Sequence, residues 1–287
     1  SMLKLKFEKY HGLGNDFVIF DEKELQEKNV TDYSKLASTV CDRHFGIGGD
    51  GIIILKYEDS QPFMLYYNSD GSQAPMCGNG IRCFAYYLKN HNLVSEDVFT
   101  VKTASGDKII ETKQTEDQFL VRVNMGKPVF DIQEHINSNN EKFIEECVDI
   151  DGEIRILSYL FTGTDHVVTF VKNLDDVDIT GLGKKIENHK DLFPKKTNVN
   201  FTQIIDKDNI NVTTWERGAG LTLACGTGAV AAAVLTAFLE KTSKKVSVKV
   251  PGGTLVVEYP EFGKDAFMTG PSEKVAEGYY NYRGDLV

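Results

Sequence analysis

Residues 224–239, ACGTGAVAAAVLTAFL, are almost entirely small or apolar. A helix that is apolar on every face is buried all round, so residues 229–239 predict a helix in the interior of a lobe. The turn that opens this helix, Cys225-Gly226-Thr227-Gly228, has a counterpart 148 residues earlier in Cys77-Gly78-Asn79-Gly80. The stretch therefore predicts two related lobes, each with a helix that begins at a Cys-Gly-x-Gly turn.

Two further pairs of segments repeat at nearly the same spacing. Residues 14–20, GNDFVIF, resemble residues 163–170, GTDHVVTF, at an offset of 149. Gly106 in TASGD matches Gly253 in VPGGT at an offset of 147. Three matches in the same order indicate a duplicated domain, with the boundary expected near residues 124–128.

Strands are predicted on both sides of each Cys-Gly turn. Runs rich in β-branched and aromatic residues precede the turns, and alternating runs follow the second one. These runs are residues 51–55, 63–67, 209–215, 246–250 and 255–259. The predicted fold class is α+β: two pseudo-symmetric lobes, residues 1–128 and 129–273, each a mostly antiparallel sheet wrapped around a central helix.

The charge of the chain argues against two classes of partner. Its 287 residues include 32 Lys plus Arg and 42 Asp plus Glu, a net charge of −10. Nucleic acids and anionic membranes are bound by cation-rich surfaces, so neither is expected as a partner. No apolar stretch approaches the roughly 20 residues that cross a bilayer, and the N-terminus lacks a signal-peptide core, which predicts a cytoplasmic protein. Five cysteines are too few, and odd in number, for a disulfide framework.

A cysteine immediately before a helix start lies beside unpaired backbone N–H groups and the positive end of the helix dipole. Both lower the pKa of a thiol, and the same N–H groups can bind a carboxylate. For a single Cys-Gly-x-Gly turn, a small buried hydrophobe next to a tight turn is the better interpretation. Two such turns at equivalent places, Cys77 and Cys225, favour a shared reactive site instead.

Two thiols around one bound carboxylate fit a specific reaction. Inversion of a stereocentre by proton transfer requires a base on one face of the carbon and an acid on the other. The α-carbon of an amino acid is a weak acid, so its carbanion must be stabilised by donors aimed at the carboxylate. Two helix N-termini supply such donors without a metal or a pyridoxal cofactor.

At these positions the chain resembles the diaminopimelate epimerase family. The resemblance lies in residues 9–17, 68–71, 76–80, 124–128, 197–199, 215–220 and 224–228. It implies a cofactor-independent, metal-free, two-thiol epimerase that interconverts LL- and meso-diaminopimelate. It also implies an active site in the cleft between the lobes and a C-terminal segment, residues 274–287, that returns to the first lobe. The expected partner is an amino-acid substrate, and the expected assembly a homodimer.

The resemblance assigns roles residue by residue. Cys77 and Cys225 exchange the α-proton, and His166 lies beside the cysteines. The reacting carboxylate is bound by Gly78, Asn79, Gly226 and Thr227. The non-reacting end is held by Asn15, Asn68, Asn198, Glu216 and Arg217. Arg217 contributes charge to the distal carboxylate, and Glu216 accepts from the amine or sets the protonation of a thiol. Taken alone, each of these polar residues also has a purely structural explanation.

Two departures from the family pattern concern substrate choice. Gly163-Thr164-Asp165-His166 stands where Gly-Asn-Pro-His is common, and Gly51 stands where some members have glutamine. A hydroxyl offers fewer donors than an amide, so lanthionine or another amino acid stays open as substrate. The proline racemase type has histidine in place of Asn79, and the phenazine-pathway type lacks the paired cysteines. A non-catalytic binder on the same fold is the alternative of a different class.

Two other motifs are discounted. Residues 46–51 match G-x-G-x-x-G but lead into an apolar run, whereas the dinucleotide fingerprint must open a helix. Cys77 and Cys83 lie six residues apart, so with His91 they do not form a metal site on one helix face. Cys41, Cys83 and Cys147 are expected to be structural or incidental.

Overall fold

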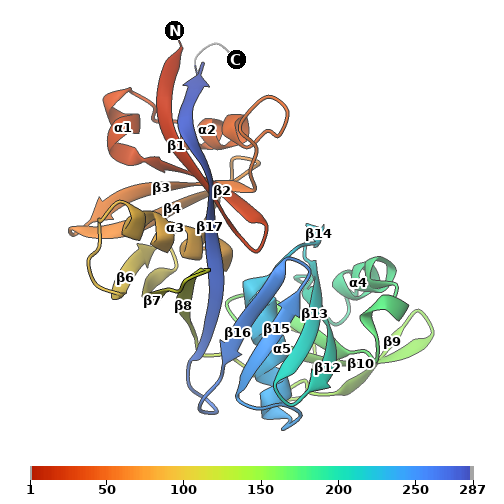
Figure 1. Ribbon diagram of the computed structural model, residues 1–287. Coiled ribbons are helices and arrows are strands. Elements are labelled where there is room, and N and C mark those ends of the chain that lie inside the picture. The colour runs from red at the N-terminus through yellow and green to blue at the C-terminus, as the bar shows by residue number, and fades with distance from the viewer. Residues whose placement is uncertain (1, 285–287) are drawn as a thin grey trace. The chain divides into compact units, whose positions relative to one another are not determined.

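Two compact units make up the described part of the chain. The computed structural model describes residues 2–284 (Figure 1). Of the described residues, 2–123 and 270–284 form the first unit, and Asn124–Thr269 forms the second. Of the predicted returning segment 274–287, residues 285–287 lie outside the described part.

The first unit contains a mixed sheet, a central helix and two peripheral helices. Its elements are β1 (Leu3–Gly12), β2 (Asn15–Asp21), α1 (Glu22–Glu27), α2 (Tyr33–Val40), β3 (Gly51–Glu58), β4 (Gln61–Asn68), β5 (Gln73–Ala74), α3 (Gly78–Asn90), β6 (Val98–Thr103), β7 (Gly106–Gln114) and β8 (Phe119–Gly126). The run 51–55 predicted as a strand begins β3, which lies parallel to β2 and is buried from Gly51 to Leu55. A continuous run of apolar residues is typical of a strand that is buried on both faces.

The second unit repeats this plan around another central helix. Its elements are β9 (Glu146–Ile150), β10 (Glu153–Phe161), β11 (Asp165–Phe170), a 3-10 turn (Leu174–Asp176), α4 (Ile179–Glu187), β12 (Asn198–Asp206), β13 (Asn209–Glu216), β14 (Gly220–Leu221), α5 (Gly226–Phe238), β15 (Lys245–Val250), β16 (Gly253–Glu258) and the first four residues of β17 (Ala266–Tyr282), whose later residues belong to the first unit. Strand β17 pairs with β16 through its first residues and with β1 through its last.

Strand pairing follows the same order in both units. In the first unit, five neighbouring pairs are antiparallel: β1–β2, β3–β4, β4–β5, β6–β7 and β7–β8. Two pairs are parallel, β2–β3 and β4–β6. In the second unit β10 to β17 take the places of β1 to β8, with β11–β12 and β13–β15 parallel. The prediction of a pseudo-symmetric, mostly antiparallel α+β fold is therefore confirmed.

The predicted buried helix is α5. It starts at Gly226, three residues before the apolar run, and every residue from Gly228 to Thr236 is buried. It packs against β11, β12, β13, β15 and β16, so the sheet of the second unit encloses it. The helix is hydrophobic all round because it faces strands on most of its sides.

No helix among residues 2–284 combines the length and the apolar character needed to span a membrane. The described helices are short, and α3 and α5 have 13 residues each.

Candidate active site

Both central helices begin immediately after a cysteine. Cys77 is the N-cap of α3 and Cys225 the N-cap of α5, and each has extended backbone angles. The peripheral helices α1, α2 and α4 are capped instead by Asp21, Asp32 and Asp178, whose side chains accept a backbone N–H. In the described residues neither cysteine makes such a side-chain cap. The first-turn N–H groups of α3 and α5 are thus left without the acidic cap that the other helices have.

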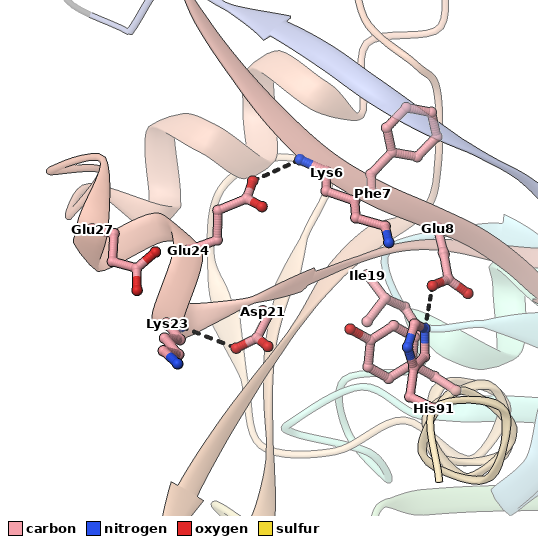
Figure 2. A pocket seen from close by; sticks show the side chains of 10 residues that line it. Lys6, Phe7, Glu8, Ile19, Asp21, Lys23, Glu24, Glu27 and His91 are labelled. Atoms are coloured by element: carbon pink, nitrogen blue, oxygen red, sulfur yellow. Dashed lines mark hydrogen bonds and ion pairs between the residues drawn. The ribbon is translucent and has the colours of Figure 1, made fainter. Parts of the chain in front are cut away.

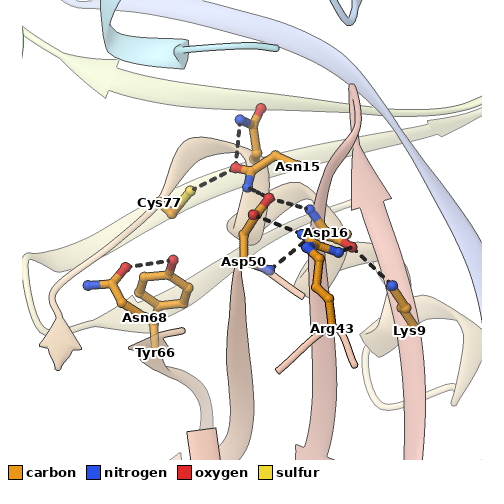
Figure 3. A network of polar contacts seen from close by, with 9 residues as sticks. Lys9, Asn15, Asp16, Arg43, Asp50, Tyr66, Asn68 and Cys77 are labelled. Carbon is orange, nitrogen blue, oxygen red and sulfur yellow. Dashed lines mark hydrogen bonds and ion pairs between the residues drawn. The ribbon is translucent and has the colours of Figure 1, made fainter. Parts of the chain in front are cut away.

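The first unit brings Asn15, Cys77 and Asn79 together. Oδ1 of Asn15 lies 3.7 Å from Sγ of Cys77, in the geometry of an S–H donor, and accepts from Nδ2 of Asn79 at 3.0 Å. Figure 3 shows the sulfur of Cys77 directed at Asn15. Two residues predicted for substrate and one predicted for proton transfer therefore lie in one cluster at the start of α3.

Carboxylates fix the orientation of the Asn15 amide. Nδ2 of Asn15 donates to Oδ2 of Asp50 at 2.6 Å, and a carboxylate only accepts, so the amide oxygen must face Cys77. Arg43 bridges Asp16 and Asp50, and Lys9 lies 3.0 Å from Asp16 (Figure 3). Burial opposes ionisation of Asp16, but the bonds from Arg43 and Lys9 outweigh it and hold its pKa well below the usual value.

A buried arginine holds the Asn79 side chain from the other side. Arg82 is fully buried in α3, and its Nη2 donates to Oδ1 of Asn79 at 2.9 Å. Its other donors reach the carbonyls of Gly78 and Pro271. Desolvation lowers the pKa of Arg82 to about 10, so the group stays charged at neutral pH. This residue was not predicted for the site, although it lies one helical turn after the Cys-Gly turn.

Asn68 is placed at the end of β4. It accepts from the Tyr66 hydroxyl at 3.0 Å, and its Nδ2 donates to Oγ of Ser72 at 3.1 Å. The second bond closes the turn of residues 68–72, as expected for the structural explanation of this asparagine. Its predicted contact with substrate stays a prediction.

The second unit joins Cys225 to a chain of buried polar groups. Oγ1 of Thr227 lies 3.7 Å from Sγ of Cys225 and 2.8 Å from Nε2 of His166. Nδ1 of His166 faces Nδ2 of Asn200 at 2.9 Å. His166 is fully buried, and desolvation lowers its pKa to about 3, so the ring is neutral. Both ring nitrogens of this predicted catalytic residue are engaged within the unit.

Arg217 is held by the two residues that depart from the family pattern. Its Nη1 donates to Oδ2 of Asp165 at 3.0 Å, and its Nη2 donates to Oγ1 of Thr164 at 2.8 Å. Asn198 bonds the backbone of both Asp165 and Arg217: it donates to the carbonyl of Asp165 and accepts from the N–H of Arg217. Thr164 therefore acts as an acceptor for this guanidinium, and the residue next to it supplies a countercharge. Glu216, which precedes Arg217, ends strand β13.

The remaining cysteines differ in burial from Cys77 and Cys225, which are half-buried. Burial raises the pKa of Cys41 and of Cys83 to about 12, and Cys147 is exposed on β9. Residues 46–51 lead into β3 and open no helix, so the dinucleotide interpretation is excluded. Cys83 lies within α3, and His91 is the C-cap of this helix.

A hollow of about 290 Å³ lies elsewhere on the first unit. Its lining mixes acidic and basic side chains, and a buried carboxylate, Glu8, bonds Nε2 of His91 at its edge (Figure 2). No residue predicted for substrate or proton transfer lines it.

Sequence reasoning missed Asn200 and Thr214. Both are buried, and Thr214 donates to Oδ1 of Asn200 at 2.7 Å. A signal was present: Asn198, Asn200 and Thr202 alternate with Val199 and Phe201 in a strand whose polar side is as buried as its apolar side. Buried polar side chains at alternate positions of a strand indicate a polar network on one face.

Solved structures share this duplicated fold. The chain superimposes on a phenazine biosynthesis protein of the PhzF family from Bacillus anthracis with a TM-score of 0.69 and 16% identity, covering 97% of this chain and 99% of that one. A hydroxyproline epimerase from Agrobacterium vitis gives a TM-score of 0.68 and 11% identity, covering 99% and 95%. At these identities the likeness concerns the fold alone, which defines the structural class.

Sequence comparison identifies the family within that class. The diaminopimelate epimerase family model matches residues 7–131 and 158–275. A diaminopimelate epimerase from Alkaliphilus metalliredigens is 44% identical over 282 residues, 97% of this chain and 98% of that protein. One from Methanococcus maripaludis is 39% identical over 279 residues, 96% and 99%. The chain belongs to the diaminopimelate epimerase family, as the resemblance in its motifs predicted.

Proposed function

We propose that the protein is an isomerase that interconverts LL- and meso-diaminopimelate by proton transfer between two thiols. One observation supports this most strongly: each duplicated unit starts its central helix at a cysteine followed by glycine, where the peripheral helices have an aspartate cap. The family relationship over nearly the whole chain supplies the substrate class.

The reaction requires one sulfur on each face of the α-carbon. The thiolate of one cysteine removes the α-proton, and the electron pair of the broken C–H bond stays on the α-carbon, delocalised into its carboxylate. The thiol of the other cysteine then gives its proton to the opposite face. The product leaves with inverted configuration, and thiolate and thiol have exchanged places. Cys77 and Cys225 are the proposed pair.

The backbone supplies stabilisation for the carbanion. Negative charge accumulates on the reacting carboxylate as the proton leaves, and N–H groups at a helix start donate to such charge. Gly78, Asn79, Gly226 and Thr227 are the first helical residues after the two cysteines. Because these groups are fixed by the helices before substrate arrives, the stabilisation needs no large rearrangement. The proposal includes no metal and no cofactor.

The distal end of the substrate is assigned to the asparagines and to Arg217. A guanidinium forms strong charge-assisted bonds with a carboxylate. The Nη1 atom of Arg217 already contacts Asp165, and this carboxylate competes with a distal substrate carboxylate. An amino acid without a distal carboxylate is therefore a second candidate substrate. Lanthionine, which keeps the distal amino-acid group and has a thioether in the linker, is the other alternative. A cytoplasmic location and a homodimer stay predictions.

Proton NMR in heavy water tests the reaction and the substrate together. Reduced protein is incubated with LL-diaminopimelate, the α-proton signal is followed, and the stereoisomers are then resolved. We expect loss of the signal with growth of the meso isomer. Folded protein with titratable thiols and no exchange would contradict the assignment of this substrate, and lanthionine and other amino acids would then be compared under the same conditions.

A further inference from the structure

A series of buried, hydrogen-bonded polar side chains lies next to Cys225. The matching positions next to Cys77 have no such series. Strand register defines the matching positions: Phe17 pairs with Gly51 as His166 pairs with Asn198, and Ile53 pairs with Tyr66 as Asn200 pairs with Thr214. The first unit thus has Phe17, Ile53 and Tyr66 where the second has His166, Asn200 and Thr214. All six are buried. Burial of polar groups is costly unless they are bonded, so the three polar residues of the second unit must form a hydrogen-bonded network at this place.

The amide of Asn200 has one possible orientation. Its Nδ2 lies 3.0 Å from the carbonyl oxygen of Val167, which only accepts, so the amino group must be on that side. Its Oδ1 accepts from the Thr214 hydroxyl at 2.7 Å. The second hydrogen on Nδ2 therefore points at Nδ1 of His166, 2.9 Å away.

This donor fixes the tautomer of His166. An Nδ1 that accepts a hydrogen bond carries no proton, and the buried ring is neutral, so the proton is on Nε2. Nε2 then donates to Oγ1 of Thr227 at 2.8 Å. The threonine oxygen accepts in this bond, so the hydroxyl hydrogen of Thr227 is available to donate to another group.

The hydroxyl hydrogen of Thr227 can reach Sγ of Cys225 at an O–S distance of 3.7 Å. A hydroxyl donor favours the thiolate over the thiol. Cys77 has the opposite kind of neighbour, because the fixed amide of Asn15 turns an acceptor oxygen toward its sulfur. The two cysteines are thus presented with groups of opposite hydrogen-bonding character.

We propose that Asn200 is a positioning residue which, through His166 and Thr227, holds Cys225 as the thiolate in the substrate-free protein. The chain of four residues, Asn200, His166, Thr227 and Cys225, is called the Cys225 relay. Gly228 is part of its construction, since a Cβ at that position would overlap Oδ1 of Asn200. The role of the thiolate rests on the proposed function: in that reaction, Cys225 is the sulfur that first acts as the base.

The tautomer of His166 is measured directly by NMR of protein labelled with ¹⁵N-histidine. The His166→Phe variant assigns the signals, since phenylalanine occupies the matching position in the first unit. We expect an unprotonated Nδ1 and a protonated Nε2 across neutral pH. A protonated Nδ1, in either the neutral or the charged ring, would overturn the proposal. The measurement needs no substrate, so it is independent of the proposed function.

Alkylation by iodoacetamide, located by peptide mapping, tests the effect on sulfur. Thr227→Val removes the donor with little change of shape and should slow alkylation of Cys225 by about tenfold or more, whereas Thr227→Ser should restore it. Alkylation of the exposed Cys147 in the same sample is the internal control. An unchanged rate at Cys225 in Thr227→Val would refute the relay.

A double variant separates positioning from a purely structural role. Asn200→Asp offers an acceptor to Nδ1 of His166, which reverses the direction of the relay and should slow alkylation of Cys225 as Thr227→Val does. When both changes are combined, we expect no further loss, because Asn200 acts through Thr227. Additive losses would contradict this and assign Asn200 a separate role. Turnover is not the readout, so an epimerase that fails on diaminopimelate would leave this test intact.

Discussion

The carboxylate of Asp165 binds the guanidinium of Arg217, with Oδ2 3.0 Å from Nη1. Asp165 is also bonded by the Tyr159 hydroxyl and has only 8% of its side chain exposed. Arg217 is the residue assigned to the distal carboxylate of the substrate. A countercharge in contact with that arginine weakens its attraction for a second carboxylate.

Asp165→Asn should therefore strengthen binding of a substrate with a distal carboxylate. The amide oxygen can still accept from Arg217, so the guanidinium keeps its place while the competing charge is lost. We expect KM for diaminopimelate to fall about threefold to tenfold, consistent with about 1 kcal/mol for a partly exposed ion pair. Steady-state kinetics measures it, with Glu153→Gln at the exposed pair with Arg155 as control. A rise in KM would show that Asp165 is needed mainly to orient Arg217.

Gly228→Ala should destabilise the protein far more than the matching Gly80→Ala. A Cβ at 228 would overlap Asn200 and lie 3.1 Å from the Thr214 hydroxyl, whereas a Cβ at 80 would have its nearest contact at 3.4 Å. Overpacking of this kind costs about 1–3 kcal/mol or more, and alanine in an unstrained helix is favoured over glycine. Urea denaturation of the two variants measures the difference. Equal stability would mean that the polar chain near α5 shifts freely.

Arg82→Met should lower stability by about 2 kcal/mol or more. The change leaves the Gly78 carbonyl, the Pro271 carbonyl and Oδ1 of Asn79 without the donor that each has now. Because Asn79 donates to Asn15 next to Cys77, catalytic turnover should fall as well. Denaturation and kinetics are measured against Arg155→Met, an exposed arginine. A variant as stable as the control would contradict the assigned contacts.

Acid should weaken the first unit through Glu8. Burial raises the pKa of this carboxyl, but bonds from Tyr10, His91 and Lys274 outweigh burial and lower it below the usual value. A carboxyl with a lowered pKa in the folded state adds stability above its unfolded pKa and loses it as pH falls through the folded pKa. The free energy of unfolding should therefore drop less steeply below about pH 4.5 in Glu8→Gln than in the parent protein. Parallel curves from urea denaturation would exclude Glu8 as a source of the acid sensitivity.

The sequence alone predicted the features whose signal is local. The apolar run of residues 229–239 was enough to predict α5, and the cysteines were correctly placed at helix starts. The duplication was visible because glycine turns mark equivalent places. Each of these features depends on residues a few positions apart.

Features that depend on strand register could not be predicted in this way. Asn200 meets His166 because β11 and β12 pair in parallel, and the connection between these strands includes α4. Arg217 meets Asp165 across 52 residues because β12 also pairs with β13, and Arg217 directly follows the end of β13. Hydrophobic periodicity indicates that a strand exists but does not give its neighbour or register. The sequence therefore showed Asp165 as a departure from the family motif but did not predict its ion pair with Arg217.

The paired variants Cys77→Ala and Cys225→Ala test the central claim most directly. Heavy-water NMR with LL-diaminopimelate measures formation of the meso isomer, circular dichroism checks the fold, and Cys147→Ala serves as the cysteine control. We expect each of the two variants to fold and to lose at least about a hundredfold in epimerisation rate, while Cys147→Ala keeps the parent rate. Full activity in either Cys77→Ala or Cys225→Ala would contradict a reaction that needs one thiol on each face of the carbon.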